Sequence, residues 1–192
     1  MVFNKLCTIQ TSEIRYWVYD PSADSEGLLN KVVTAVDPPY CHCEIQTPDG
    51  MACSIHMNAT IHLKQRKFTN EGYTCVRIPC THTQGVMARS KMQELFEQQL
   101  RFSLRGMLLA HYNIDGCSLG HTFCSKIAAD VLRSAGIIST DAILSPSGLY
   151  HALLKGQGSR VIVFTRKQEA RPVVSSGVAI DAIDWRPVHS TS

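Results

Sequence analysis

The sequence predicts an α+β fold, in which one antiparallel sheet packs against helices. The first half of the chain is rich in strand-like segments and contains a strong hairpin signal. The second half contains segments with helical periodicity and then a short apolar, β-branched stretch. Strands followed by helices, rather than alternating with them, are typical of α+β proteins.

The clearest single element is a hairpin over residues 40–58. Its centre is Thr47-Pro48-Asp49-Gly50, which suits a type I turn followed by a glycine bulge. In this register the numbers of paired residues sum to 98, so His42 faces His56 and Glu44 faces Ser54. A plain four-residue turn would shift the pairing by one residue and mix the polar and apolar faces.

Other segments fill out the sheet and the helical layer. We expect further strands at residues 14–19, 61–67, 73–78 (closed by Pro79) and 160–165, and a strand or short helix at residues 28–36. Ser90 with Gln93 forms a capping-box pattern, which predicts a helix from there to about residue 110. Ser145 and Pro146 predict the start of a last helix that ends near Gly156.

Composition limits the class of protein. The 192 residues are 44% hydrophobic and 18% charged, which is typical of a globular domain. We expect one domain over residues 1–166 and a polar tail or appended segment over residues 167–192. The net charge of +3 is spread out, so no nucleic-acid partner is expected, and no segment is apolar enough to span a membrane. No signal-peptide pattern begins the chain, so we expect a cytoplasmic protein, or one delivered without a signal, with its eight cysteines reduced.

Residues 121–137 predict a helix that carries a cysteine in its first turn. Apolar residues recur there at helical spacing, with Thr122 as N-cap and Gly136 as the left-handed residue at the end. Cys124 lies near the positive end of this helix, which lowers a thiol pKa and suits a nucleophile. The alternative is an inert core cysteine, because free cysteine is often buried.

A nucleophilic thiol needs a base, and the polar face of the hairpin supplies candidates. Alternation places His42, Glu44, Ser54 and His56 on one face of the two strands. One imidazole would take the thiol proton while a second group orients the ring. A cross-strand neighbour, here His56, is better placed to orient the ring than Glu44, which lies two positions along the same strand. We keep both Glu44 and His56 as candidates for the orienting group.

A metal site is the alternative from a different class. Histidines and cysteines cluster in sequence at three places: Cys41, His42 and Cys43; Cys75, Cys80 and His82; and Cys117, His121 and Cys124. None of these contains the C-x-x-C pair of a strong zinc pattern. This hypothesis is a non-catalytic Cys/His-rich interaction module that holds zinc.

The order of these pieces resembles the permuted NlpC-type papain-like cysteine hydrolases, the YiiX-like group. The resemblance covers roughly residues 30 to 165, and in it the histidine strand precedes the cysteine helix. It is carried by the following pieces: His42-Cys43-Glu44, Asp49-Gly50, Ser54, Cys124-Ser125, Leu132, Ala135-Gly136, Ser145-Pro146 and Leu149.

The resemblance implies a papain-like thiol hydrolase without a cofactor or metal. Cys124 would be the nucleophile and His42 the base, with Glu44, Ser54 or His56 as the third group. The oxyanion hole would include the backbone N–H of Cys124. The implied activity is that of an amidase or peptidase, and the implied substrate is a peptide, an isopeptide or a peptidoglycan stem.

Overall fold

The structure is a computed structural model, and it describes residues 12–21, 33–36, 38–68, 72–156 and 162–165. Its centre is a six-stranded antiparallel sheet with the order β4-β3-β2-β1-β5-β8. The strands are β1 (Ser12–Tyr19), β2 (His42–Gln46), β3 (Met51–Ser54), β4 (His62–Gln65), β5 (Tyr73–Cys80) and β8 (Ile162–Thr165). The predicted α+β class, with an antiparallel sheet packed against helices, is confirmed.

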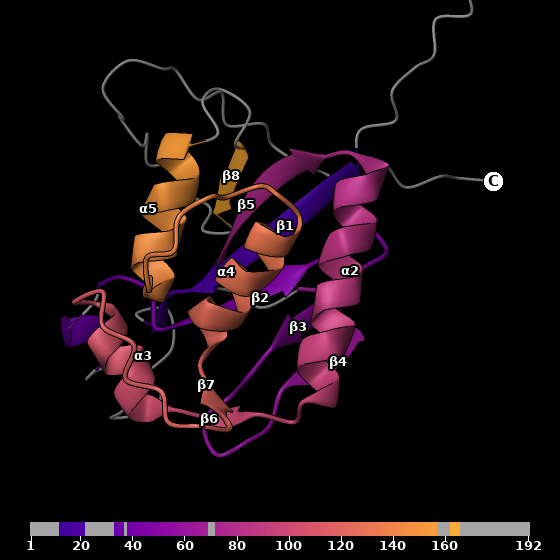
Figure 1. The fold of residues 1–192 in the computed structure, drawn as a ribbon. Helices are drawn as coiled ribbons and strands as arrows, with labels where there is room; N and C mark the ends of the chain where they lie inside the picture. Colours follow the sequence, from indigo (N-terminus) through magenta and orange to yellow (C-terminus); the bar gives the residue numbers. More distant parts are fainter. Residues whose placement is uncertain (1–11, 22–32, 37, 69–71, 157–161, 166–192) are drawn as a thin grey trace, which may run out of the picture.

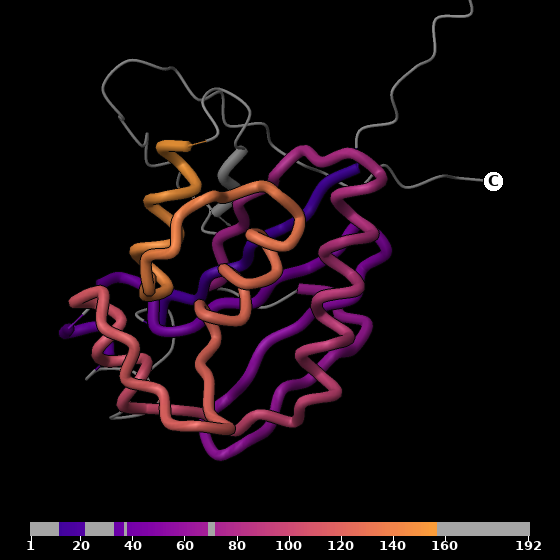
Figure 2. Tube along the Cα trace, viewed as in Figure 1, coloured from indigo at the N-terminus to yellow at the C-terminus, as the bar shows by residue number. Residues whose placement is uncertain are grey.

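Helices cover one face of this sheet. The longer ones are α2 (His82–Glu97), α4 (Cys124–Ser134) and α5 (Pro146–Gly156), and α4 lies between the other two (Figure 1). The short helix α3 (Leu104–Ala110) lies beside the small parallel pair β6 (Arg101–Phe102) and β7 (His121–Thr122). The tube in Figure 2 shows the chain passing from α3 along this pair and then directly into α4.

The hairpin register agrees with the sequence prediction. Ile45 pairs with Cys53 and Gln46 with Ala52, so the residue numbers sum to 98. The turn closes by a hydrogen bond from the Gly50 N–H to the Thr47 carbonyl at 2.9 Å, and Gly50 has a φ of 84°. A positive φ is the reason for a glycine at the bulge.

The predicted helix over residues 90–110 is wrong in both its start and its continuity. The capping box is formed by Thr81 and Gln84, so α2 begins at His82, eight residues earlier than predicted. Gln99 then adopts a φ of 48°, and the chain makes β6 before a separate helix begins after the N-cap Ser103. The apolar period continues across this break, which is why the sequence pattern could not show it.

Two smaller predictions are also corrected. The N-cap of α4 is Phe123, without a side-chain cap, because Thr122 belongs to β7; Cys124 is therefore the first residue of the helix. Strand β5 does not end at Pro79 but continues to Cys80. Pro79 lies beyond the residues of β5 that pair with β8, so the N–H group that proline lacks is not needed for a hydrogen bond to β8. The Ser145 cap is confirmed: its Oγ accepts a hydrogen bond from the Gly148 N–H at 3.0 Å.

The core lies between the sheet and the helical layer. Its members from the sheet include Ile14, Tyr16, Cys43, Ile45 and Val76, and those from α4 include Ile127, Val131 and Leu132. The predicted tail at 167–192 lies outside the described residues, as does most of the segment 28–36, of which residues 33–36 are helical. No helix in the described ranges is long and apolar enough to span a membrane.

Candidate active site

Cys124 lies where the core meets the end of the sheet. As the first residue of α4, it precedes backbone N–H groups that have no partner within the helix, and the helix dipole is positive there. The side chain is buried against β2. The same apolar stripe that packs α4 on the sheet therefore holds the thiol in a fixed place.

Two neighbours on β2 set the charge of this thiol. The Cys43 thiol donates a hydrogen bond to the Cys124 sulfur, and the His42 imidazole forms a second one. The bond from Cys43, together with the contact with His42, outweighs burial and lowers the pKa of Cys124 well below its ordinary value. Cys43 keeps its proton, because burial and the Cys124 charge raise its own pKa.

Cys124 differs in this respect from the other cysteines that the structure describes. Burial raises the pKa of Cys41, Cys53 and Cys75 to about 12, and it raises the pKa of Cys80 and Cys117 as well. A lowered pKa is thus a property of one thiol among the seven described. A lowered pKa favours the thiolate form, which is the form that a nucleophilic cysteine requires.

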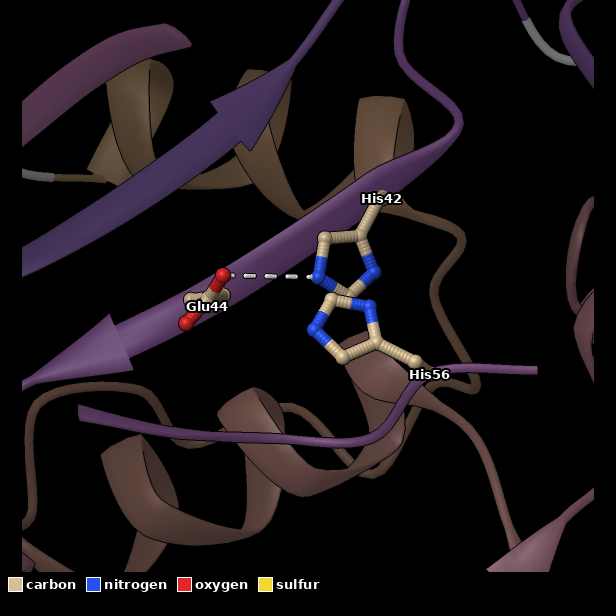
Figure 3. A group of neighbouring side chains, drawn as sticks. All are labelled: His42, Glu44 and His56. Carbon is tan, nitrogen blue, oxygen red and sulfur yellow. Dashed lines mark ion pairs between the residues drawn. The ribbon is translucent and has the colours of Figure 1, made fainter. Parts of the chain in front are cut away.

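His42 is the first residue of β2 and lies between Cys124 and Glu44. Its Nε2 atom is 3.6 Å from Oε1 of Glu44, which leaves Nδ1 for the thiol (Figure 3). Burial by itself would lower the pKa of His42, but its contacts with Cys124 and Glu44 raise it to about 9. The stable state of the pair near neutral pH is therefore a thiolate beside an imidazolium.

Glu44 is a fully buried carboxylate that is surrounded by donors. The Arg66 guanidinium pairs with Oε1, His62 Nε2 lies 3.5 Å from Oε2, and the Tyr73 hydroxyl donates to Oε1 at 3.4 Å. Burial would raise the pKa of Glu44, but His42, His62 and Arg66 hold it well below its usual range. The carboxylate is thus ionised and immobilised against the His42 ring.

His56 occupies a different position relative to His42. The two rings stack with their centroids 4.6 Å apart, and the His62 ring also stacks on His56, with a centroid distance of 5.0 Å. Figure 3 shows His56 over the face of His42, whereas Glu44 lies at the edge that carries Nε2. Burial and the neighbouring charges of His42 and His62 lower the pKa of His56 to about 4, so it is neutral near pH 7.

Ser54, the third candidate for the orienting group, makes a backbone contact instead. Its hydroxyl is fully buried and donates to the Cys43 carbonyl at 2.6 Å. This bond ties β3 to β2 beside the site. The Ser54 hydroxyl therefore bonds to the backbone of the strand that carries His42 and Glu44, and not to the His42 imidazole.

The sequence analysis missed the residues that hold Glu44 and the thiol. His62 belongs to no motif in the sequence, yet it pairs with Ser54 across β3 and β4. Extending the pairing argument through this second hairpin would have brought His62 onto the polar face that carries Glu44. Arg66, Tyr73 and the thiol of Cys43 reach the site through tertiary contacts that no short-range pattern signals.

The chain matches no family model, no curated protein and no solved structure in comparisons with known proteins. The resemblance to permuted papain-like hydrolases therefore stays a prediction. The functional argument depends on the geometry of the site itself.

The zinc alternative predicted clusters that combine cysteines with histidines. In the described parts of the chain, the group of three donors that converges is a different one, His42, Glu44 and His56, whose candidate ligand atoms lie within 4.8 Å of one another. Zinc favours a carboxylate that is free to coordinate. Here Glu44 is paired with the Arg66 guanidinium, whose positive charge opposes a cation at the same oxygen. The arrangement fits an orienting carboxylate better than a metal ligand.

Proposed function

We propose that this protein is a thiol hydrolase, an amidase or peptidase that cleaves an amide bond through a thioester on Cys124. The observation that carries the proposal is the chain of contacts from Cys124 to His42 to Glu44. A nucleophile, a base and a group that orients the base are the parts that acyl transfer by cysteine requires. The non-catalytic zinc module has no comparable support from the contacts.

Each side chain has a role in two balanced steps. The Cys124 thiolate attacks the carbonyl carbon and forms a C–S bond, and the C–N bond breaks as the His42 imidazolium gives its proton to the leaving amine. Water then attacks the thioester while neutral His42 takes a proton from it. The C–S bond breaks, the acid leaves, and the thiolate and imidazolium are restored.

The position of Cys124 on α4 also suits stabilisation of the intermediate. The backbone N–H groups of the first turn have no partner inside a helix, and they point toward the N-terminal end. An oxyanion that forms at the carbonyl attacked by Cys124 lies at this end. The N–H of Cys124 therefore belongs to the oxyanion hole in this proposal.

The order of the elements supports the papain-like part of the proposal. The histidine strand β2 precedes the cysteine helix α4 in the chain, as in the permuted NlpC-type enzymes that the sequence resembles. An antiparallel sheet behind the cysteine helix is compatible with that fold. By this resemblance the substrate is a peptide, an isopeptide or a peptidoglycan stem.

The test is the alkylation of each cysteine by substoichiometric iodoacetamide at pH 6.5, read by peptide mapping. An ordinary thiol with a pKa of about 8.5 is only about 1% ionised at that pH, so an activated thiol reacts first. We expect modification of Cys124 before any other cysteine. Equal modification of all cysteines, or least modification of Cys124, would overturn the proposal.

Three variants, one of them a control, complete the test. His42→Ala should abolish the selectivity, because the pKa of Cys124 rises when the imidazolium is lost, whereas His82→Ala at the exposed start of α2 should leave it intact. Cys124→Ala should abolish hydrolysis but lower the free energy of unfolding by less than about 1.5 kcal/mol, because the side chain loses only its sulfur atom and Glu44 remains as a partner for His42. A His42→Ala protein with unchanged reactivity at pH 6.5 would exclude the dyad.

A further inference from the structure

Cys43 is a thiol beside the nucleophile that takes no part in the two steps of the proposed hydrolysis. It is fully buried on β2, in the core cluster that also contains Cys124. Its thiol donates a hydrogen bond to the Cys124 sulfur, and its backbone N–H donates to the same atom. Two sulfur atoms in contact are the starting arrangement for a disulfide.

The packing of α4 against β2 holds the two sulfur atoms together (Figure 1). Cys124 begins α4, and Ile127 and Val131 of the same helix are buried in the core against the sheet. Two cysteines form a disulfide without movement of the backbone only if their side chains are directed toward each other. A hydrogen bond between the two sulfur atoms requires the same orientation. The fold therefore places a second thiol where it can react with Cys124.

A small oxidant that enters the site meets Cys124 before Cys43. Cys124 forms part of the wall of a cavity of about 330 Å³, and Cys43 does not belong to the described part of that wall. A water molecule takes up about 30 Å³ and hydrogen peroxide has only one oxygen atom more, so the cavity has room for it. Peroxides react with the thiolate form of cysteine, which is the form favoured at Cys124.

We propose that Cys124 and Cys43 form a redox switch, in which hydrogen peroxide oxidises Cys124 and Cys43 then closes a disulfide with it. In the first step the Cys124 thiolate attacks one oxygen atom of the peroxide, and the O–O bond breaks. The second oxygen atom leaves as water with the proton of the His42 imidazolium, and Cys124 becomes a sulfenic acid. In the second step the Cys43 sulfur attacks the Cys124 sulfur, the S–O bond breaks, and the oxygen leaves as water with the Cys43 proton. Two electrons have then passed from the two sulfur atoms to the peroxide.

The order of these steps follows from the charges at the site. Burial and the contact with the Cys124 thiolate raise the pKa of Cys43, so Cys43 stays protonated while the thiolate is present. Oxidation of Cys124 removes that negative charge and so makes the Cys43 thiol easier to ionise.

The disulfide regulates the nucleophile, so its effect on activity rests on the proposed function. Without a second thiol, a sulfenic acid is oxidised further to a sulfinic acid, which thiol reductants do not reduce. A disulfide between Cys43 and Cys124 instead blocks the nucleophile in a form that a reductant reverses. The switch therefore stops hydrolysis under oxidising conditions and preserves the site.

The experiment treats the reduced full chain with a few equivalents of hydrogen peroxide at pH 7. The remaining thiols are blocked with N-ethylmaleimide, and the protein is digested without reductant and mapped by mass spectrometry. We expect a cross-linked pair of peptides that joins Cys43 to Cys124. Alkylation of Cys124 by iodoacetamide at pH 6.5 should fall by about tenfold or more after peroxide treatment and should recover after dithiothreitol.

Matched variants identify the second thiol. Cys43→Ser keeps an O–H donor for Cys124 but cannot form the disulfide, so Cys124 should become a sulfinic acid and dithiothreitol should not restore its alkylation. Cys53→Ser, at another buried cysteine of the same hairpin, should behave as the wild type. Cys41→Ser, at the other cysteine in the described part of the cavity wall, should do so too. If Cys43→Ser does not fold, the peptide map of the wild type decides by itself.

The outcomes separate the switch from the hydrolase. A disulfide from Cys124 to Cys41 or to any other cysteine would overturn the switch, as would equal recovery by dithiothreitol in Cys43→Ser and the wild type. Direct conversion of Cys124 to a sulfinic acid in the wild type would also overturn it, and in all three cases the hydrolase survives. If Cys124 is not alkylated first at pH 6.5 before any peroxide is added, the proposed function fails, and the peptide map then judges the switch separately.

Discussion

The Nε2 atom of His42 lies 3.6 Å from Oε1 of Glu44, the residue two positions further along β2. Residues i and i+2 of a strand share a face but lie about 6.5–7 Å apart, so this approach depends on the side chains. Glu44 is held by Arg66, His62 and Tyr73. These partners fix its carboxylate at the edge of the imidazole, whereas the cross-strand residue His56 stacks on the face of the ring.

This geometry predicts different effects for the two candidate orienting residues. In Glu44→Gln the negative charge beside His42 is lost, so the pKa of His42 falls from about 9. Because the imidazolium is present below that pKa, activity that declines above about pH 9 in the wild type should decline at a lower pH in the variant. We expect kcat/KM to fall by about 10- to 100-fold, measured as a pH–rate profile.

The matched variant is His56→Phe, which keeps a ring stacked on His42. Because His56 is neutral and contacts the ring face, the alkaline limb of the profile should stay in place and the loss should be less than about tenfold. The opposite ranking, with the limb moved by His56→Phe and not by Glu44→Gln, would make His56 the orienting residue.

The hydrogen bond from Cys43 to Cys124 predicts a role for a thiol that is not itself the nucleophile. Cys43→Ala removes this donor, so the pKa of Cys124 should rise and its alkylation at pH 6.5 should slow several-fold. Cys53→Ala removes another buried cysteine of the same hairpin, in which Cys53 faces Ile45, and should leave the rate unchanged. Equal rates in the two variants would show that Cys43 has no influence on the nucleophile.

The ion pair between Arg66 and Glu44 should make the free energy of unfolding depend on pH in the acid range. The pKa of Glu44 is lower in the folded state than its unfolded value of about 4.3, so its contribution is complete above that value and is lost as the pH falls below it. Arg66→Met removes the ion pair and so raises the pKa of Glu44 in the folded state. At pH 7 the free energy of unfolding should fall by about 1–3 kcal/mol, and the difference from the wild type should begin to shrink only as the pH falls below about 4.3 toward pH 3.

Urea denaturation across this pH range provides the measurement. Lys64→Met, which removes an exposed charge on β4, should change the free energy of unfolding by less than about 0.5 kcal/mol at each pH. A deficit in Arg66→Met that stays constant down to pH 3 would mean that Glu44 is not the group through which Arg66 acts.

The two candidate starts of the long helix predict opposite results for two alanine variants. Thr81→Ala removes the capping hydroxyl that accepts from the Gln84 N–H at 3.2 Å, and it should cost about 1 kcal/mol of stability. Ser90→Ala lies at an exposed position inside α2 and should be neutral or slightly stabilising, because alanine favours helices. Thermal unfolding of both proteins is the measurement. A larger loss of stability in Ser90→Ala than in Thr81→Ala would support a helix that begins at Ser90 instead of after Thr81.

The sequence by itself determined the elements whose signals are local. The type I turn with Gly50 fixed the hairpin register, the Ser145-Pro146 pair fixed the start of α5, and the apolar stripe after Cys124 fixed the buried face of α4. In each case the cause lies within a few residues, in backbone conformation or in periodicity, so it can be read along the chain.

Only the tertiary structure decided which side chains meet. The break at Gln99 and the packing of α4 against β2 bring Cys124 to Cys43 and His42, which are about eighty residues away in the chain. The surroundings of Glu44 come from β4, β5 and the residue after β4, Arg66. Burial and charge at such contacts set each pKa, and neither quantity exists before the chain has folded.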